Sequence, residues 1–134
     1  MGRECGPEGF TDPLVKVLEH YQLVDYKRGD NYIRFHEMPA EVLIALTEKL
    51  PQDNLKGRQN CGPTIEAFIA LAVQEPASLF GGYIITRVRD DESFVIDEVS
   101  VPSCLDMAST PIAAYLPADE DDVVCDGWRR LWWD

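Results

Sequence analysis

Cys61 is the residue whose surroundings come closest to those of a catalytic group. It lies in the segment 59–64, with the sequence QNCGPT, directly before a stretch with helical spacing of apolar residues. The N-terminus of a helix stabilises a thiolate, and the upstream Gln59 could donate a hydrogen bond to an oxyanion. The pattern is consistent with nucleophilic catalysis by the Cys61 thiolate.

The same segment resembles, over about six residues, the nucleophile motif of papain-like and bacteriocin-processing cysteine peptidases. This resemblance implies hydrolysis with a histidine as general base. In those families the histidine follows the cysteine, whereas His20 and His36, the two histidines of this chain, both precede Cys61. Because a triad is defined by geometry and not by chain order, a cysteine-dependent hydrolase that uses Cys61 with His20 or His36 is one alternative function. The other interpretation is a loop and helix N-cap at Cys61, a helix-end role for His20 and a strand-end role for His36.

The remaining residue patterns predict no metal site and no cofactor. The four cysteines, at positions 5, 61, 104 and 125, form no C-x-x-C pair and have no histidine at metal-ligand spacing. The acidic run Asp119, Glu120, Asp121, Asp122 lacks the alternating pattern of a calcium loop. We interpret this run as a solvated loop that could recognise a basic partner.

All three tryptophans lie within six residues at the end of the printed sequence, at Trp128, Trp132 and Trp133, beside Arg129. Two interpretations stay open. The segment could fold back and complete the core, or it could expose an aromatic and arginine patch of the kind that dominates binding hot spots. Both could hold, with one ring inside and another outside.

The negative charge is concentrated in the last third of the chain. The 134 residues carry a net charge of −12, and the segment 90–134 alone has 12 acidic and 2 basic residues. Such a balance argues against direct binding to nucleic acid or to an anionic membrane. No apolar run approaches the ~20 residues that span a bilayer, and without a hydrophobic leader we expect a cytoplasmic protein with free thiols.

These observations favour a protein-binding accessory or regulatory module over an enzyme. The partner is expected to be a protein, and the acidic residues would suit a basic one. The predicted contact residues are Asp119, Glu120, Asp121, Asp122, Trp128, Arg129, Trp132 and Trp133. A second alternative is an acidic inhibitor that mimics nucleic acid with rows of carboxylates. The oligomeric state does not follow from the sequence.

The expected architecture is a single compact α+β domain, with an antiparallel sheet of two hairpins packed against two or three helices. Residues 1–12 are expected to form a flexible arm before a domain at 13–134. Apolar spacing and prolines predict helices at about 13–22, from Pro39 to Pro51 and from Pro63 to Pro76. A first hairpin is expected around the turn 27–30, and the polar segment 52–62 is expected to be a surface loop.

A second hairpin is expected from about Leu79 to Val101. Pairing about the acidic tip 90–93 predicts that Ile84 faces Val99, and Gly81 with Gly82 suggests a bulge or a close backbone approach. Further along, 112–116 could be a strand, and Trp128, Leu131 and Trp132 have the i, i+3, i+4 spacing of one helix face.

Overall fold

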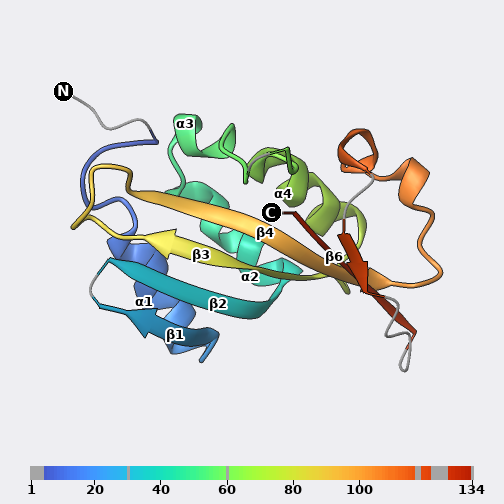
Figure 1. Cartoon of the computed structure of the whole chain (residues 1–134), viewed down its shortest axis with the longest axis horizontal. Coiled ribbons are helices and arrows are strands. Elements are labelled where there is room, and N and C mark those ends of the chain that lie inside the picture. Colours follow the sequence, from blue (N-terminus) through green and yellow to red (C-terminus); the bar gives the residue numbers. More distant parts are fainter. Residues whose placement is uncertain (1–4, 30, 60, 117–118, 122–126, 134) are drawn as a thin grey trace.

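Helix α1 (Asp12–His20) is the first helix or strand of the described residues, and groups of strands and helices follow it along the chain (Figure 1). The computed structural model describes residues 5–29, 31–59, 61–116, 119–121 and 127–133. The other helices are α2 (Ala40–Leu46), α3 (Gln52–Leu55) and α4 (Ile65–Gln74), with 3-10 turns η1 (Thr47–Lys49), η2 (Met107–Ser109) and η3 (Ala113–Tyr115). The strands are β1 (Val24–Arg28), β2 (Tyr32–Pro39), β3 (Leu79–Ile85), β4 (Ser93–Pro102), β5 (Asp119–Asp121) and β6 (Trp128–Trp132).

The predicted α+β class and the two hairpins are confirmed, and the sheet is larger than the two hairpins alone. All neighbouring strands are antiparallel, and the order is β1-β2-β3-β4-β6-β5. β6 joins the free side of β4, and β5 joins β6. The last part of the chain therefore extends the sheet.

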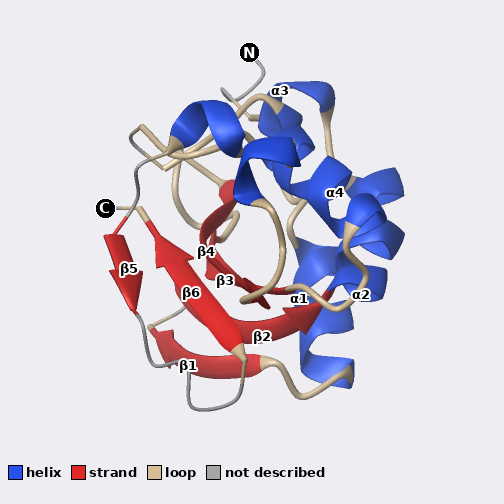
Figure 2. Cartoon of the chain, turned by 90° about the vertical axis from the view of Figure 1, so that its right-hand side faces the viewer, coloured by secondary structure: helices blue, strands red, loops and turns tan. Residues whose placement is uncertain are grey.

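The helices form where their end signals predict them. Pro13 occupies the first turn of α1, and the Thr64 side chain caps α4 by accepting a hydrogen bond from the Ala67 amide at 3.2 Å. Figure 2 shows α1, α2 and α4 together on one side of the sheet. The expected layer of two or three helices is thus present, with three.

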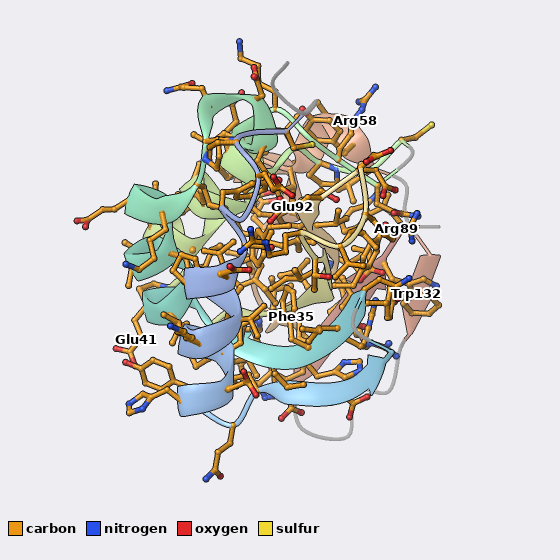
Figure 3. The ribbon with its side chains drawn as sticks, turned by 90° about the vertical axis from the view of Figure 1, so that its left-hand side faces the viewer. Phe35, Glu41, Arg58, Arg89, Glu92 and Trp132 are labelled. Carbon is orange, nitrogen blue, oxygen red and sulfur yellow. The ribbon has the colours of Figure 1, made fainter. Side chains whose placement is uncertain are left out.

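The core lies between this helix layer and one face of the sheet. Its largest fully buried side chains are aromatic: Phe35 stacks on Phe94 with ring centroids 5.4 Å apart, and Phe68 meets Phe80 edge to face at 5.9 Å. Figure 3 shows Phe35 between β2 and α1. Burial of these apolar side chains supplies the main driving force for folding.

The predicted register of the β3–β4 hairpin is wrong, although the irregularity expected at Gly81 and Gly82 is confirmed. Ile84 pairs with Phe94 instead of Val99, and the register shifts where Gly81 faces Glu98 and Gly82 faces Ile96. The extra residue on β4 is Asp97. Because of this bulge, Phe94 and Ile96 before it and Val99 and Val101 after it all lie in the core.

The expectation that residues 52–62 form only a surface loop is wrong, because this segment contains a short helix and the buried side chain of Asn54. Residues 52–55 form α3, and the Asn54 side chain is 1% exposed. The Asn54 amide accepts a hydrogen bond from the Phe94 backbone amide at 2.9 Å and donates one to the Phe94 carbonyl at 3.0 Å. A side chain thus pairs with the edge of β4 in the stretch before β6 joins it, which protects that edge.

The segment after Pro102 departs most from the sequence analysis. The possible strand at 112–116 is instead the 3-10 turn η3, and residues 119–121 of the predicted acidic loop form β5. Asp122 lies outside the described residues. Residues 128–132 form a strand and not a helix, because β4 offers a free edge with which their backbone pairs. Their i, i+3, i+4 spacing matches a helix only by coincidence.

Glu92 holds the residues before α1 against the β3–β4 turn. The side chain is 0% exposed, and its carboxylate accepts hydrogen bonds from Gly9 N at 2.8 Å, Thr11 N at 3.1 Å and Thr11 Oγ1 at 2.5 Å. Phe10, between these two residues, is 8% exposed. Part of the segment 1–12 expected as an arm therefore packs on the domain, while residues 1–4 lie outside the described residues.

Replacing Glu92 by glutamine is expected to lower the free energy of unfolding by about 2 kcal/mol, because an amide cannot accept from all of these donors. Urea unfolding of the two proteins measures the difference. The matched control is Asp90→Asn in the same turn, where an exposed side chain should change stability by less than about 0.5 kcal/mol. Equal effects of the two substitutions would contradict the role assigned to Glu92.

Candidate functional site

The side of the sheet away from the helices carries a mixture of aromatic and charged side chains, and we call it the open face. Alternation along β2, β3, β4 and β6 brings these side chains to one side. None of them is fully buried except Glu98, which is 7% exposed. The open face is made up of Tyr32, Arg34, His36, Tyr83, Asp97, Glu98, Ser100, Trp128, Arg130 and Trp132.

Three register shifts concentrate charged groups in the middle of this face. One extra residue occurs in β1 at Asp25, one in β2 at 36–37, and one in β4 at Asp97. A bulge turns two consecutive side chains toward the same side of a sheet. For this reason Asp97 and Glu98 both lie on the open face.

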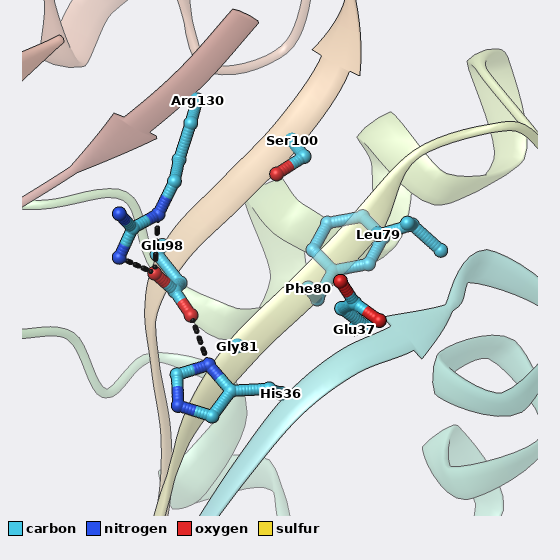
Figure 4. Close-up of a pocket in the computed structure, with 8 residues that line it drawn as sticks. All are labelled: His36, Glu37, Leu79, Phe80, Gly81, Glu98, Ser100 and Arg130. Carbon is cyan, nitrogen blue, oxygen red and sulfur yellow. Dashed lines mark hydrogen bonds and ion pairs between the residues drawn. The ribbon is translucent and has the colours of Figure 1, made fainter. Parts of the chain in front are cut away.

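Glu98 is the centre of the resulting network (Figure 4). Its Oε2 accepts hydrogen bonds from Arg130 Nε at 2.9 Å and Arg130 Nη2 at 2.6 Å, and its Oε1 lies 2.8 Å from His36 Nδ1. Because an ionised carboxylate only accepts, His36 Nδ1 carries the hydrogen in this contact. His36 Nε2 continues the chain of contacts to Asp25 Oδ2 at 3.3 Å, and Arg34 Nη2 lies 3.6 Å from Glu98 Oε1.

Gly81 makes this arrangement possible. Glu98 belongs to β4 and His36 to β2, so the Glu98 side chain has to cross β3 between them. It does so over Gly81, where any Cβ would overlap the carboxylate. The need for close approach, and not a turn, requires glycine at this position.

Arg34 and Asp97 form the second ion pair of the open face, with Arg34 Nη1 2.7 Å from Asp97 Oδ2. Burial, reinforced by the negative charge of Glu98, raises the pKa of Asp97 above its ordinary value despite this partner. Asp97 Oδ1 is buried and has no hydrogen-bond partner among the described residues. Burial also acts to raise the pKa of Glu98, but hydrogen bonding and charge attraction from Arg130 and then His36 outweigh it, so this pKa lies below 4.5.

Aromatic rings flank the ion pairs on both sides. Tyr32 stacks on Tyr83 with centroids 5.3 Å apart, and the Tyr83 hydroxyl donates to Gln59 Oε1 at 2.5 Å. On the other side, Arg130 Cζ lies 5.1 Å from the centre of the Trp132 ring, a cation–π contact. The guanidinium of Arg130 is thus held by Glu98 and Trp132 together.

A polar cavity of about 260 Å³ lies beside Glu98, with His36, Glu37, Ser100 and Arg130 in its wall. Both oxygens of Glu98 are engaged within the protein, as described above. These contacts suit a carboxylate that fixes the shape of the surface better than one that acts as a general acid or base, which would need a free lone pair. Among the described residues, no three His, Cys, Asp or Glu side chains gather closely enough to hold a metal ion.

No hydrogen bond among the described residues joins Cys61 to His20 or His36, the residues of the alternative thiol site. Cys61 is exposed. His36 is engaged by Glu98 and Asp25, and His20 contacts the ring of Tyr21, centroid to centroid 5.0 Å. A thiol protease would need one of these rings beside the sulfur.

The described residues of the predicted partner-binding set belong to β5, β6 and the residue after β6, at one edge of the sheet. Trp128 and Trp132 lie on the open face of β6, Arg129 lies on its other side, and β5 (Asp119–Asp121) pairs alongside β6. Trp133 completes the core, the first of the two interpretations of the tryptophan segment. It is 7% exposed, packs edge to face on Phe68 and donates a hydrogen bond from Nε1 to the Tyr115 carbonyl at 3.1 Å. One tryptophan is therefore inside while the other two are partly exposed.

The acidic turn of the β3–β4 hairpin lies at the opposite end of the sheet from β6 (Figure 1). In that turn Glu92 is buried and Asp91 Oδ2 pairs with Arg89 Nη2 at 2.7 Å. The two acidic segments therefore do not join into one continuous row of carboxylates.

Sequence reasoning missed Arg34, Glu98 and Arg130 as one unit. Arg87, which comes from the same hairpin as Glu98, pairs instead with Asp12, Nη1 to Oδ2 at 3.1 Å. The available signal was the Gly81-Gly82 pair, which marked the place where something had to approach the backbone. Nothing in the spacing indicated that the approaching group was a carboxylate.

Comparison with known protein families, with curated proteins and with solved structures finds no match. The longest helix of the described residues, α4, has 10 residues, and none of the described helices combines the length and apolar character needed to cross a bilayer.

Replacing Gly81 by alanine is expected to displace the Glu98 carboxylate and to lower the free energy of unfolding by about 2 kcal/mol. In a Glu98→Ala background the obstacle is absent, so the same substitution should cost at least about 1 kcal/mol less. Urea unfolding of the four proteins in this cycle gives the coupling. An equal cost of Gly81→Ala in both backgrounds would disprove the packing of Glu98 over Gly81.

The opposite pKa shifts of Glu98 and Asp97 predict opposite pH dependences. The folded pKa of Glu98 is lowered. The ionised carboxylate therefore contributes its full stabilisation above pH 4.5, and this stabilisation is lost as pH falls through the folded pKa. The stability difference between wild type and Glu98→Gln should therefore shrink as the solution is acidified.

Asp97 serves as the matched control. Its folded pKa is raised, so its ionised form destabilises the protein at neutral pH, and this penalty disappears as pH falls through the folded pKa toward 3.8. Wild type should gain stability relative to Asp97→Asn over that interval. Urea unfolding between neutral pH and pH ~3 measures both differences, and slopes of the same sign would contradict the assignment.

Proposed function

We propose that this chain is a protein-binding accessory or regulatory module and that the open face, at the end formed by β4, β6 and β5, is its contact surface. The observation that carries the proposal is the partly exposed assembly of Trp132, Arg130, His36 and Arg34 around the buried carboxylate of Glu98.

The composition of this surface supports binding. Tryptophan, tyrosine and arginine are the residues most enriched in binding hot spots, and the open face has two of each, Trp128 and Trp132, Tyr32 and Tyr83, Arg34 and Arg130. By contrast, the helix-covered face is filled with phenylalanine and aliphatic side chains. Rings and guanidinium groups left partly accessible on a sheet offer large contact area with polar ends.

The ion pairs of the open face favour binding in a second way. Arg130 is fixed by two hydrogen bonds to Glu98 and by the Trp132 ring, and Arg34 by Asp97. Side chains that are ordered before association lose less conformational entropy when a partner binds. The surface is therefore preorganised.

A basic region on the partner is favoured by the charge of the segment 90–134, which has 12 acidic and 2 basic residues. The acidic strand β5 (Asp119–Asp121) pairs with β6 and so borders the aromatic part of the open face. Complementary charge mainly accelerates association and selects the partner, while the aromatic and arginine groups supply affinity.

The test compares proteins captured from a lysate by immobilised wild type, Trp132→Ala and Val73→Ala, each quantified by mass spectrometry. Val73 is 64% exposed on α4 in the helix layer, so its variant is a control for a surface outside the open face. At least one captured protein should fall by about tenfold with Trp132→Ala and stay unchanged with Val73→Ala. Its capture should also weaken with added salt.

Thermal unfolding of the variants excludes a trivial loss of fold. If Trp132→Ala is as stable as wild type and still captures every protein that wild type captures, the open face is not the contact surface. Loss of the same proteins with Val73→Ala would equally contradict the proposal.

A further inference from the structure

A second concave surface lies in the helix layer, between α1 and α2, and we call it the α1–α2 groove. It has a volume of about 320 Å³, and its wall consists of Lys16, Val17, His20, Tyr21, Ala45, Leu46 and Lys49. Lys16 to His20 belong to the last turn and a half of α1, Ala45 and Leu46 to the end of α2, and Lys49 to η1.

The floor of the α1–α2 groove is apolar. Leu46 is 0% exposed at the bottom, and Val17 and Ala45 line the sides. Tyr21 is 54% exposed, one of the most exposed large apolar side chains among the described residues. Its ring meets that of His20, also in the wall, edge to face with centroids 5.0 Å apart.

The rim of the groove is basic in a strongly acidic protein. Apart from Tyr21, the titratable side chains in its wall are Lys16, His20 and Lys49, and all three are basic. The whole chain, by contrast, has 12 Lys and Arg against 24 Asp and Glu. Within the described residues neither Lys16 nor Lys49 forms an ion pair. Their ammonium groups are available to carboxylates from outside. Glu41, on α2, points away into solvent (Figure 3).

We propose that the α1–α2 groove binds a partner segment in which a large apolar side chain is flanked by carboxylates. The apolar side chain would cover Val17, Ala45 and Leu46 and pack against the Tyr21 ring, and the carboxylates would pair with Lys16 and Lys49. Charge complementarity argues for this occupant, because a basic segment would meet three basic groups at the rim.

This binding does not depend on the function proposed for the open face. The groove belongs to the helix layer, and the open face lies on the other side of the sheet (Figure 2). The two surfaces also have opposite charge preferences. Occupation of both would make the protein an adaptor between an acidic and a basic partner.

The probe is a phage-displayed library of random short peptides, selected on the immobilised full chain. The enriched peptides are expected to combine acidic and large apolar residues. One of them is then synthesised with a fluorescent label, together with a version in which its Asp and Glu are replaced by Asn and Gln. Fluorescence anisotropy should show that the amide version binds about tenfold more weakly or worse.

Variants of the chain locate the binding. Lys16→Glu with Lys49→Glu should weaken peptide binding by about tenfold or more, whereas Lys56→Glu, an exposed lysine on the C-terminal side of α3, should leave it unchanged. Ala45→Trp, which places a large ring in the groove, should abolish it. Trp132→Ala should not affect it, which separates failure here from failure of the open-face proposal.

The proposal is overturned if no peptide is enriched, if the enriched peptides lack acidic residues, or if they bind wild type and the Lys16→Glu/Lys49→Glu variant equally well. It is also overturned if sedimentation shows a wild-type dimer that Ala45→Trp dissociates, since the occupant would then be a second copy of the chain. Thermal unfolding confirms that each variant is folded.

Discussion

A single carboxylate, that of Glu98, ties five strands of the sheet to one another. It lies on β4, crosses β3 over Gly81, contacts His36 and Arg34 of β2 and receives Arg130 from β6. Through His36 the network extends to Asp25 on β1. A charge that is 7% exposed is tolerated only where its partners are complete. Gly81, the bulge at Asp97 and the placement of β6 are all conditions for that completeness.

The same network explains why one face of the sheet can stay uncovered. A second layer of helices would have to bury arginines and carboxylates that now retain partial access to water, at a large desolvation cost. Arg130, fixed by Glu98, holds the neighbouring ring of Trp132 at the surface, and the Tyr83 ring is held by its stacking on Tyr32 and its hydrogen bond to Gln59. The contacts that stabilise the network thus also keep these side chains ordered at the surface. The polar surface and the apolar core lie on opposite faces of the sheet.

The sequence was most informative where the structure depends on neighbouring residues. Prolines and apolar spacing located the helices, the two hairpins followed from their turns, and Gly81 with Gly82 located the bulge. The register of the second hairpin failed because Glu92, which looks like part of a solvated tip, is drawn inside by the amides of Gly9 and Thr11. β5 and β6 were missed because an acidic run and three tryptophans become strands only when β4 provides an edge. The partners of Glu98 are likewise remote along the chain, so no local pattern contains them.

The bulge in β4 also restricts how this chain can change its length during evolution. Before the bulge, Phe94 and Ile96 are the core residues, and after it Val99 and Val101 are, so the two halves of the strand are out of phase by one position. In the regularly paired parts of β4, a single-residue deletion or insertion would invert the side chains beyond it, turning aromatic or aliphatic ones outward and polar ones into the core. Deletion of Asp97 at the bulge would instead restore plain alternation and keep both halves facing the core, with the loss of one of the two carboxylates that the bulge brings to the open face. The bulge is thus the place where β4 could change its length by one residue, whereas its residue count elsewhere is fixed.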